Sequence, residues 1–261
     1  MKISEALNCV DISRLEAEIL LYSTLGTDRS YLLINPDMEL SDDQESTFIE
    51  YIERRSKGEP IAYITGIKEF YGREFKVTSD VLIPRPSTEG LIDLAKDFLN
   101  NPCDEVRDVD NAIVCISKHL NKCSSIKTLV DIGTGSGCIA ITLALEVPNI
   151  KIIATDVSDK ALKVAKSNAE KHGVSDRIDF RTGSLLDPIA DLNEEFLLVS
   201  NPPYVPDGEA INDEAQYEPR SAIFAGDEGL DLIEPLIKSA KNNSYCWGFV
   251  VECRREQAIS L

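Results

Sequence analysis

The fold follows from one stretch, Thr128-Leu129-Val130-Asp131-Ile132-Gly133-Thr134-Gly135-Ser136-Gly137. Its first half is a short apolar run, typical of a buried strand, and its second half is a glycine-rich turn. An apolar helix is expected from Cys138 to Glu146, and a second strand from Lys151 to Thr155 ends at Asp156. Strand, turn, helix and strand in this order predict an α/β fold, doubly wound around a mostly parallel sheet.

The same alternation continues downstream. An amphipathic helix is expected over Ser158–His172, with small and apolar residues on one side, and Gly173 ends it. Apolar runs at 178–180 and 196–199 predict two further strands. We therefore predict a Rossmann-like domain over residues 85–261.

Upstream of this domain, residues 1–66 are predicted to form a small helical domain. Apolar residues recur at helical spacing over 15–22 before Gly26, and Ser41 with Gln44 has the form of a capping box. Residues 67–84 are predicted to be a β-hairpin linker with its turn at Gly72-Arg73.

Between the hairpin and the sheet we expect a helix followed by a linker. Ser87 is predicted to cap a helix that runs through Phe98. The polar stretch Asn100–Ser125 is predicted to be an elongated linker.

The glycine turn and two aspartates predict a cofactor site. Only glycine lets the backbone N–H groups of such a turn approach a ligand closely. Asp156, at the end of the second strand, can accept both ribose hydroxyls of NAD, FAD or S-adenosylmethionine. A dinucleotide fingerprint has Gly-x-Gly-x-x-Gly, whereas this turn has Gly-x-Gly-x-Gly after Asp131, a carboxylate that suits the ammonium group of S-adenosylmethionine. We therefore favour S-adenosylmethionine, with Leu185 as an apolar wall for its adenine ring.

The segment Asn201-Pro202-Pro203-Tyr204 predicts the chemistry. It follows an apolar strand, so it lies at the edge of the sheet where ligands bind. The Asn201 side-chain oxygen and the Pro202 carbonyl can each accept one N–H of an NH₂ group, which aims its lone pair and stabilises the charge that develops during methyl transfer. Tyr204 can stack on a flat acceptor. Taken alone, the segment is also compatible with a Pro-Pro loop that simply ends a strand.

Charge and composition limit the kinds of partner, metal site and cellular location that we expect. The net charge is −18, from 45 acidic and 27 basic residues, and this disfavours direct binding of nucleic acid. No apolar run is long enough to span a membrane, and no metal site is expected because His119 and His172 lack metal-spaced neighbours. The 7 cysteines include no Cys-x-x-Cys pair, which favours a reducing, cytoplasmic location.

Further motifs extend the pattern over most of the chain. They are Gly58-Glu59-Pro60-Ile61-Ala62-Tyr63-Ile64-Thr65-Gly66, Glu69-Phe70-Tyr71-Gly72, Leu82-Ile83-Pro84-Arg85-Pro86-Ser87-Thr88-Glu89, Tyr217-Glu218-Pro219-Arg220 and Ala225-Gly226-Asp227-Glu228-Gly229-Leu230. With the glycine turn and the Asn-Pro-Pro-Tyr segment, they make the chain resemble the release-factor glutamine methyltransferases (PrmC, also called HemK).

The resemblance implies a class I methyltransferase that methylates the glutamine amide in the Gly-Gly-Gln motif of peptide-chain release factors, gripped in part by the helical domain. It places the glutamine contacts on Asn201, Pro202, Pro203 and Tyr204. It places the cofactor contacts on Gly133, Thr134, Gly135, Ser136, Gly137, Asp156, Leu185 and Asn201. The alternatives are a ribosomal-protein glutamine methyltransferase and, less favoured by charge, a nucleic-acid adenine methyltransferase.

The chain departs from the family pattern at several points. Ser87 stands where the family usually has Glu, Gly90 stands where it has an aliphatic residue, and the linker after Asn100 is longer. Val250-Val251-Glu252 matches the start of the family's closing segment, yet the sequence stops at Leu261, so the terminal strand pair is expected to be missing and the sheet edge to be incomplete. Arg85 is expected either to contact the cofactor or to form a salt bridge.

Overall fold

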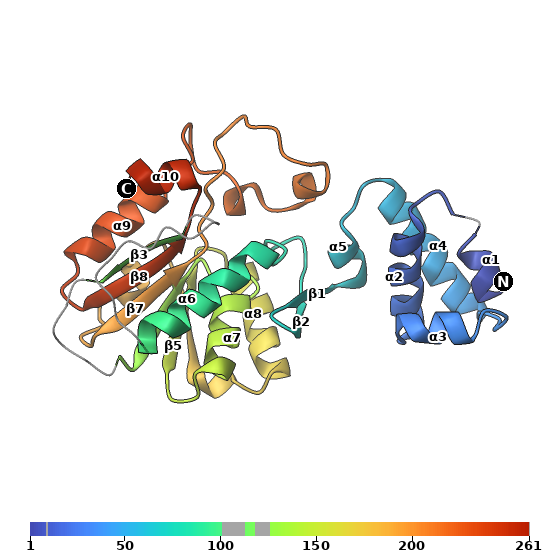
Figure 1. Ribbon diagram of the computed structural model, residues 1–261, viewed down its shortest axis with the longest axis horizontal. Helices are drawn as coiled ribbons and strands as arrows, with labels where there is room; N and C mark the ends of the chain where they lie inside the picture. Colours follow the sequence, from blue (N-terminus) through green and yellow to red (C-terminus); the bar gives the residue numbers. More distant parts are fainter. Residues whose placement is uncertain (9, 101–112, 118–125, 261) are drawn as a thin grey trace. The chain divides into compact units, whose positions relative to one another are not determined.

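A computed structural model describes residues 1–8, 10–100, 113–117 and 126–260. The chain divides into two compact units, which we describe separately (Figure 1). The helical unit comprises residues 1–67 together with residues 211–217, and the sheet unit comprises residues 68–210 and 218–261. No helix of the described residues is long and apolar enough to cross a membrane.

Short helices build the helical unit. Their bounds are α1 (Ile3–Ala6), α2 (Arg14–Leu25), α3 (Arg29–Ile34), α4 (Asp42–Ser56) and α5 (Ile61–Thr65). The predicted ends are confirmed: Gly26 closes α2 with φ 63°, and the Ser41 hydroxyl accepts the Gln44 backbone N–H at 3.2 Å at the start of α4. Leu20, Leu21 and Phe48 are buried in the core that these helices share.

The predicted hairpin is present, formed by β1 (Ile67–Phe70) and β2 (Arg73–Lys76). Its turn lies at Tyr71 and Gly72, with φ 53° and 71°, one residue earlier than predicted. Two successive residues with positive φ make the tight turn whose twist matches that of a hairpin.

The sheet unit holds a six-stranded sheet in the order β3-β8-β7-β4-β5-β6. Its strands are β3 (Ile113–Ser117), β4 (Thr128–Ile132), β5 (Lys151–Asp156), β6 (Ile178–Thr182), β7 (Phe196–Ser200) and β8 (Cys246–Glu252). The pairs from β6 through β8 are parallel, and β3 is the one antiparallel strand of this sheet among the described residues. The predicted doubly wound, mostly parallel sheet is confirmed.

Helices cover both faces of the sheet (Figure 1). They are α6 (Glu89–Asn100), α7 (Cys138–Glu146), α8 (Asp159–Lys171), α9 (Ile233–Asn242) and α10 (Arg255–Ser260). Leu129 of β4 packs in one core with residues of α6, α7 and α8, whereas its neighbour Val130 packs in a second core with residues of α9. Successive side chains of β4 thus enter opposite cores, as a strand buried on both faces requires.

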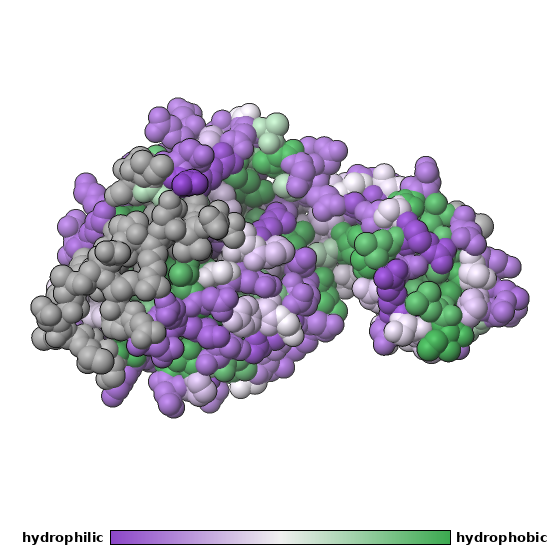
Figure 2. All heavy atoms as spheres, in the orientation of Figure 1, coloured by the Kyte–Doolittle hydropathy of each residue, from purple (hydrophilic) through white to green (hydrophobic). Residues whose placement is uncertain are grey.

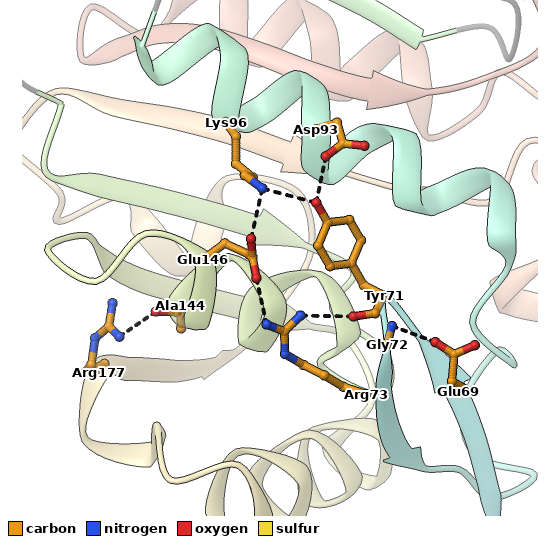
Figure 3. Close-up of polar contacts among 9 residues, drawn as sticks. All are labelled: Glu69, Tyr71, Gly72, Arg73, Asp93, Lys96, Ala144, Glu146 and Arg177. Atoms are coloured by element: carbon orange, nitrogen blue, oxygen red, sulfur yellow. Dashed lines mark hydrogen bonds and ion pairs between the residues drawn. The ribbon is translucent and has the colours of Figure 1, made fainter.

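A polar network fixes the hairpin turn to α6 and α7 (Figure 3). Glu146 accepts from Arg73 at 2.6 Å and from Lys96 at 2.9 Å, and the Tyr71 hydroxyl donates to Asp93 at 2.7 Å. Lys96 also donates to the Tyr71 hydroxyl at 3.1 Å, so the network is continuous.

The sequence interpretation was wrong at two places. The stretch predicted as a linker contains β3, which pairs with β8 from Ile113↔Glu252 to Ser117↔Gly248. The sheet edge expected to be incomplete is therefore covered along β8. Ser87 does not cap a helix: it lies within the 3₁₀ turn Pro86–Thr88, and its hydroxyl donates to Glu252 at 3.1 Å. The hydrogen bond to Glu252, which is distant in the sequence, takes the place of the expected bond between the Ser87 hydroxyl and a backbone N–H of the helix.

Three of the described cysteines lie in the core. Cys138, Cys246 and Cys253 are buried, and none of them forms a disulfide with a described residue. The predictions for Cys9, Cys103, Cys123 and His119 fall outside the described residues, and so does the prediction for the Cys115 side chain.

Candidate active site

The order of the strands brings the glycine turn and the Asn-Pro-Pro-Tyr segment together. The chain runs from β4 outward through β5 to β6, then returns to place β7 on the other side of β4. Ile132 at the end of β4 pairs with Ser200 at the end of β7, so Gly133 and Asn201 leave neighbouring strands at the same edge. A topological switch point of this kind is where open α/β sheets bind ligands.

A cavity of about 300 Å³ opens at this edge, within the sheet unit. Most of the predicted site residues line it: Gly133, Thr134, Gly135, Ser136, Asp156, Leu185, Asn201, Pro202 and Pro203. Asp131, Gly137 and Tyr204 do not line it. These three predicted residues lie behind its wall, where they hold the lining residues in place.

The three glycines of the turn have different roles. All have positive φ, but a Cβ on Gly133 or Gly135 would meet nothing within 4 Å. A Cβ on Gly137 would lie 2.9 Å from Ile141 Cδ1 and 3.1 Å from the Cβ of Ala165. Gly133 and Gly135 thus leave open space above the backbone for a ligand, whereas Gly137 allows α7 and α8 to pack closely.

Asp131 supports the turn from inside the protein. Its Oδ2 accepts the Thr134 hydroxyl at 2.6 Å and the Ala140 backbone N–H at 3.2 Å, and it is fully buried. Burial raises the pKa of this carboxyl to about 7, against the effect of those two donors. Its Oδ1 is buried and, among the described residues, has no hydrogen-bond partner. A cationic group nearby would compensate that unpaired oxygen.

Asp156 and Leu185 frame the opposite part of the cavity. The Asp156 carboxylate accepts the backbone N–H groups of Gly135 and Ser158, each at 2.9 Å, and burial raises its pKa against the effect of these donors. Leu185 has φ 49°, a conformation that branched or bulky residues rarely adopt. Backbone strain of this kind gathers at functional sites, and here it turns an apolar side chain into the cavity wall.

The Asn201 amide is oriented by a hydrogen bond that the sequence did not reveal. Its Nδ2 donates to the Thr88 hydroxyl at 2.9 Å. Within the described part of the chain, no hydrogen bond reaches Asn201 Oδ1 or the Pro202 carbonyl oxygen. Two acceptor oxygens of adjacent residues therefore remain available at the cavity.

Tyr204 anchors the segment instead of lining the cavity. Its hydroxyl donates to Glu252 at 3.3 Å, and burial together with the Glu252 carboxylate raises the Tyr204 pKa to about 12. Its carbonyl accepts from the Gln257 side chain at 3.0 Å. A Cβ on Gly229 would lie 2.2 Å from that carbonyl oxygen, so only glycine fits beneath the segment.

Arg85, for which the sequence left two roles open, and Glu89 of α6 both have structural partners. Arg85 forms an ion pair with the buried Glu218, whose other oxygen accepts the Ile83 N–H, and Arg85 also lines the cavity. Glu89 accepts the Tyr71 backbone N–H at 2.9 Å. The sequence did not identify Thr88, Glu252 and Gln257 as site residues. Glu252 alone gave a signal, because a charged residue at the end of an apolar strand indicates a functional or paired carboxylate.

Two protein-family models match parts of the chain. Residues 2–66 match the PrmC N-terminal domain, and residues 106–217 match the methyltransferase small domain. A release factor glutamine methyltransferase of Koribacter versatilis is 41% identical over 226 residues, which are 85% of this chain and 72% of that protein. A second, of Coxiella burnetii, is 38% identical over 88% of this chain and 74% of its own length.

The chain also matches longer proteins. A bifunctional methyltransferase of Rickettsia typhi is 41% identical over 240 residues, which are 89% of this chain but 44% of that protein. The chain thus spans less than half the length of that relative. The matches along nearly the whole chain confirm the resemblance found in the sequence: the chain belongs to the release factor glutamine methyltransferase family.

Proposed function

We propose that the chain transfers a methyl group from S-adenosylmethionine to the side-chain amide nitrogen of the glutamine in the Gly-Gly-Gln motif of peptide-chain release factors. The observation that carries this proposal is the Asn201 amide. Its NH₂ is bound to Thr88, so its oxygen and the Pro202 carbonyl remain as paired acceptors beside a cavity built on a glycine turn. The names of the relatives support the acceptor.

The cavity fits the proposed cofactor. Gly133 and Gly135 leave room over the backbone, the Asp156 carboxylate suits ribose hydroxyls, and Leu185 suits the face of an adenine ring. Asp131 lies behind the cavity wall with one oxygen unpaired among the described residues, so it would favour a cationic amino-acid end through its charge and not through direct contact. When bound, S-adenosylmethionine supplies a methyl group made electrophilic by a positively charged sulfur.

Asn201 and Pro202 would activate the acceptor. An amide nitrogen is a poor nucleophile because its lone pair is delocalised. Asn201 Oδ1 and the Pro202 carbonyl each accept one of its N–H bonds, which aims the lone pair and stabilises the positive charge that grows on nitrogen. After transfer, the methylated nitrogen is acidic enough to release a proton to water, so the site needs no strong base.

The surface and charge of the chain support a protein acceptor. Figure 2 shows hydrophobic surface on the helical unit, where Leu15, Leu33 and Ile34 are 55%, 66% and 77% exposed. Exposed apolar residues gathered on a small unit favour a protein partner, and the net charge of −18 disfavours nucleic acid. We assign substrate recognition to the helical unit, and a cytoplasmic location follows from a substrate that acts in translation.

Methyl-labelled S-adenosylmethionine tests the proposal. We expect label on a bacterial release factor and none on the same factor after a Gln→Glu change in its Gly-Gly-Gln motif. Asn201→Ala should lower turnover by roughly 100-fold while cofactor affinity stays within about threefold. Asn193→Ala is the matched control, because the Asn193 side chain lies outside the cavity and donates to the Asp191 carbonyl at 3.0 Å. Label on DNA or on a ribosomal protein instead would identify a different acceptor and contradict the proposal.

A further inference from the structure

Gln257 of α10 holds the end of the acceptor segment, which is the stretch from Asn201 to Tyr204. Its side-chain Nε2 donates to the Tyr204 carbonyl at 3.0 Å. The same nitrogen donates to the carbonyls of Glu228 and Gly229 at 3.1 and 3.2 Å. Gln257 is 7% exposed, so water cannot readily replace a hydrogen bond that is lost. One buried amide therefore joins the acceptor segment to the loop that precedes α9.

The chemistry of the partners fixes the direction of these hydrogen bonds. Gln257 Oε1 accepts the Arg254 backbone N–H at 2.9 Å, and a backbone N–H can only donate. The three carbonyl oxygens can only accept, so Nε2 must face them. A flipped amide would set an oxygen against all three carbonyls. Converging carbonyl oxygens repel one another, and burying them without a donor is costly, so Gln257 sets where they lie.

Gly229 confines the same carbonyl from a second side. Its φ is 71°, and a Cβ there would lie 2.2 Å from the Tyr204 carbonyl oxygen and 2.8 Å from the carbonyl carbon. The same Cβ would lie 2.8 Å from Gln257 Nε2. The Tyr204 carbonyl is thus held between a hydrogen-bond donor and the backbone of a glycine, with no room for a side chain.

Two prolines carry the position of this carbonyl back toward the cavity. At its other end the acceptor segment follows Ser200, whose hydroxyl donates to the Ile132 carbonyl at 2.7 Å within the sheet. Between these two fixed ends stand Pro202 and Pro203, whose rings lock φ, and a residue before proline is confined to extended conformations. The segment therefore has few rotatable bonds that could absorb a shift at Tyr204, and the Pro202 carbonyl moves with it.

We propose that Gln257 is a positioning residue that fixes the Tyr204 carbonyl, and with it the Pro202 carbonyl that accepts an N–H of the substrate amide. Gln257 does not line the cavity and needs no contact with substrate or cofactor. The inference rests on the proposed function, because the placement acts through transfer to an amide that these oxygens hold. A misplacement of about 1 Å at a reacting group can lower the rate by roughly 100-fold.

Two single variants and their combination test this role. Gln257→Met keeps the length of the side chain and removes both N–H donors. Gly229→Ala pushes a methyl group against the same carbonyl. Gln216→Met is the control for the first change, because the exposed Gln216 side chain donates to the Asp213 carboxylate at 3.2 Å. Gly173→Ala is the control for the second, because Gly173 has φ 69° and a Cβ there meets nothing within 4 Å.

Each protein is assayed for kcat, KM for the release factor and Kd for S-adenosylmethionine. The kcat is expressed per cofactor-binding site, so that unfolded protein does not count. We expect kcat of Gln257→Met and of Gly229→Ala to fall roughly 10- to 100-fold, with KM within about threefold and Kd within about twofold. The double variant should lose no more than about threefold beyond the less active single variant, because both changes act through one carbonyl. Both controls should keep kcat within about twofold of the wild type.

An active wild type with an equally active Gln257→Met overturns the inference alone. Losses that multiply in the double variant overturn it too, as does a fall in kcat that is accompanied by an equal loss of cofactor affinity. If Gln257→Met binds no cofactor, Gln257→Asn takes its place. This variant keeps the amide but withdraws it by one methylene from the three carbonyls, and an unchanged kcat there overturns the inference. A wild type that labels no release factor overturns the proposed function and this inference with it.

Discussion

Asp131 is a carboxylic acid held in the interior of the protein. Its carboxyl is fully buried, and burial raises its pKa to about 7 although Thr134 and Ala140 donate to it. The folded protein therefore binds this proton more tightly than the unfolded chain does. The resulting stability is fully present below the unfolded pKa, near 4, and is lost as the pH rises through about 7.

Asp131→Asn should remove this dependence on pH. An asparagine oxygen can accept from both Thr134 and Ala140, and its amide carries no charge to bury. The free energy of unfolding is measured with urea, without cofactor, at pH values from 4 to 8.5. As the pH rises over this range, the value for the wild type should fall relative to the value for the variant by up to about 4 kcal/mol. A difference between the two proteins that stays constant over this range would show that Asp131 does not titrate near pH 7.

The residues that the sequence revealed are those whose chemistry is local. The glycine turn, Asp156 and Asn201 each follow a predictable strand, so the switch point of the sheet brings them together. Thr88 and Gln257 could not be predicted, because their partners Asn201 and Tyr204 lie 113 and 53 positions away in the chain. Hydrogen-bonding capacity is readable from a sequence, but the pairing that satisfies it is set by tertiary structure.

At the scale of elements, the hairpin turn depends on Glu146. This carboxylate at the end of α7 binds Arg73 of β2 and Lys96 of α6 together (Figure 3). The Lys96 pKa lies well above its usual range because of Glu146 first and the Tyr71 hydroxyl second. The side chains of Arg73, Lys96 and Glu146 are 26%, 30% and 23% exposed. Salt therefore screens the attraction between their charges less than it screens a fully exposed pair.

Glu146→Gln should loosen this junction. We expect the free energy of unfolding to fall by about 1 kcal/mol, and the difference from the wild type to shrink at high salt. Glu74→Gln is the matched control in the same hairpin, because the Glu74 pair with Lys171 is 3.4 Å long and its side chains are 65% and 44% exposed. Urea unfolding at low and high salt measures both. An equal loss in the two variants would mean that the network adds nothing beyond an ordinary surface pair.

Elements with strong local signals were predicted nearly to the residue. The bounds of α7 and β4 agree with the sequence, since an apolar run and a glycine turn leave little choice. β3 was missed although residues 113–116 are mostly β-branched, because polar flanks masked a short strand. Residues 113–117 form a strand because the edge of β8 offers unpaired backbone groups to them. The local sequence pattern carries no information about that distant partner.

At the scale of the whole molecule, the chain passes between the two units three times, at 67/68, 210/211 and 217/218. The last two crossings lie in the loop that follows the acceptor segment, and ion pairs hold it along its length. Glu209 pairs with Arg254 and Glu218 pairs with Arg85 within the sheet unit. Glu214 pairs with Arg55 at 2.7 Å within the helical unit. Two arginines of the sheet unit thus hold the ends of the loop, and one arginine of the helical unit holds its middle.

Arg55 is the residue on which the middle of this loop depends. It is 16% exposed and also binds Glu16 at 2.6 Å, and a second bond joins the Tyr217 hydroxyl to the Lys57 carbonyl at 2.7 Å. Arg55→Met removes the charge and keeps an apolar stem, so residues 211–217 should open more often. Losing about 1 kcal/mol of local stability raises the open population roughly fivefold, and cleavage at Glu214 by a glutamate-specific protease should accelerate by the same factor.

Arg14→Met is the control for that experiment, because Arg14 pairs with Glu18 in the same unit and does not bind the loop. Mass spectrometry of the fragments identifies the site of cleavage. Faster cleavage in both variants would mean that the helical unit as a whole is destabilised, and unchanged cleavage in Arg55→Met would mean that the loop is held without Glu214. Faster cleavage in Arg55→Met alone would show that an arginine of the helical unit controls the loop that leads away from Asn201.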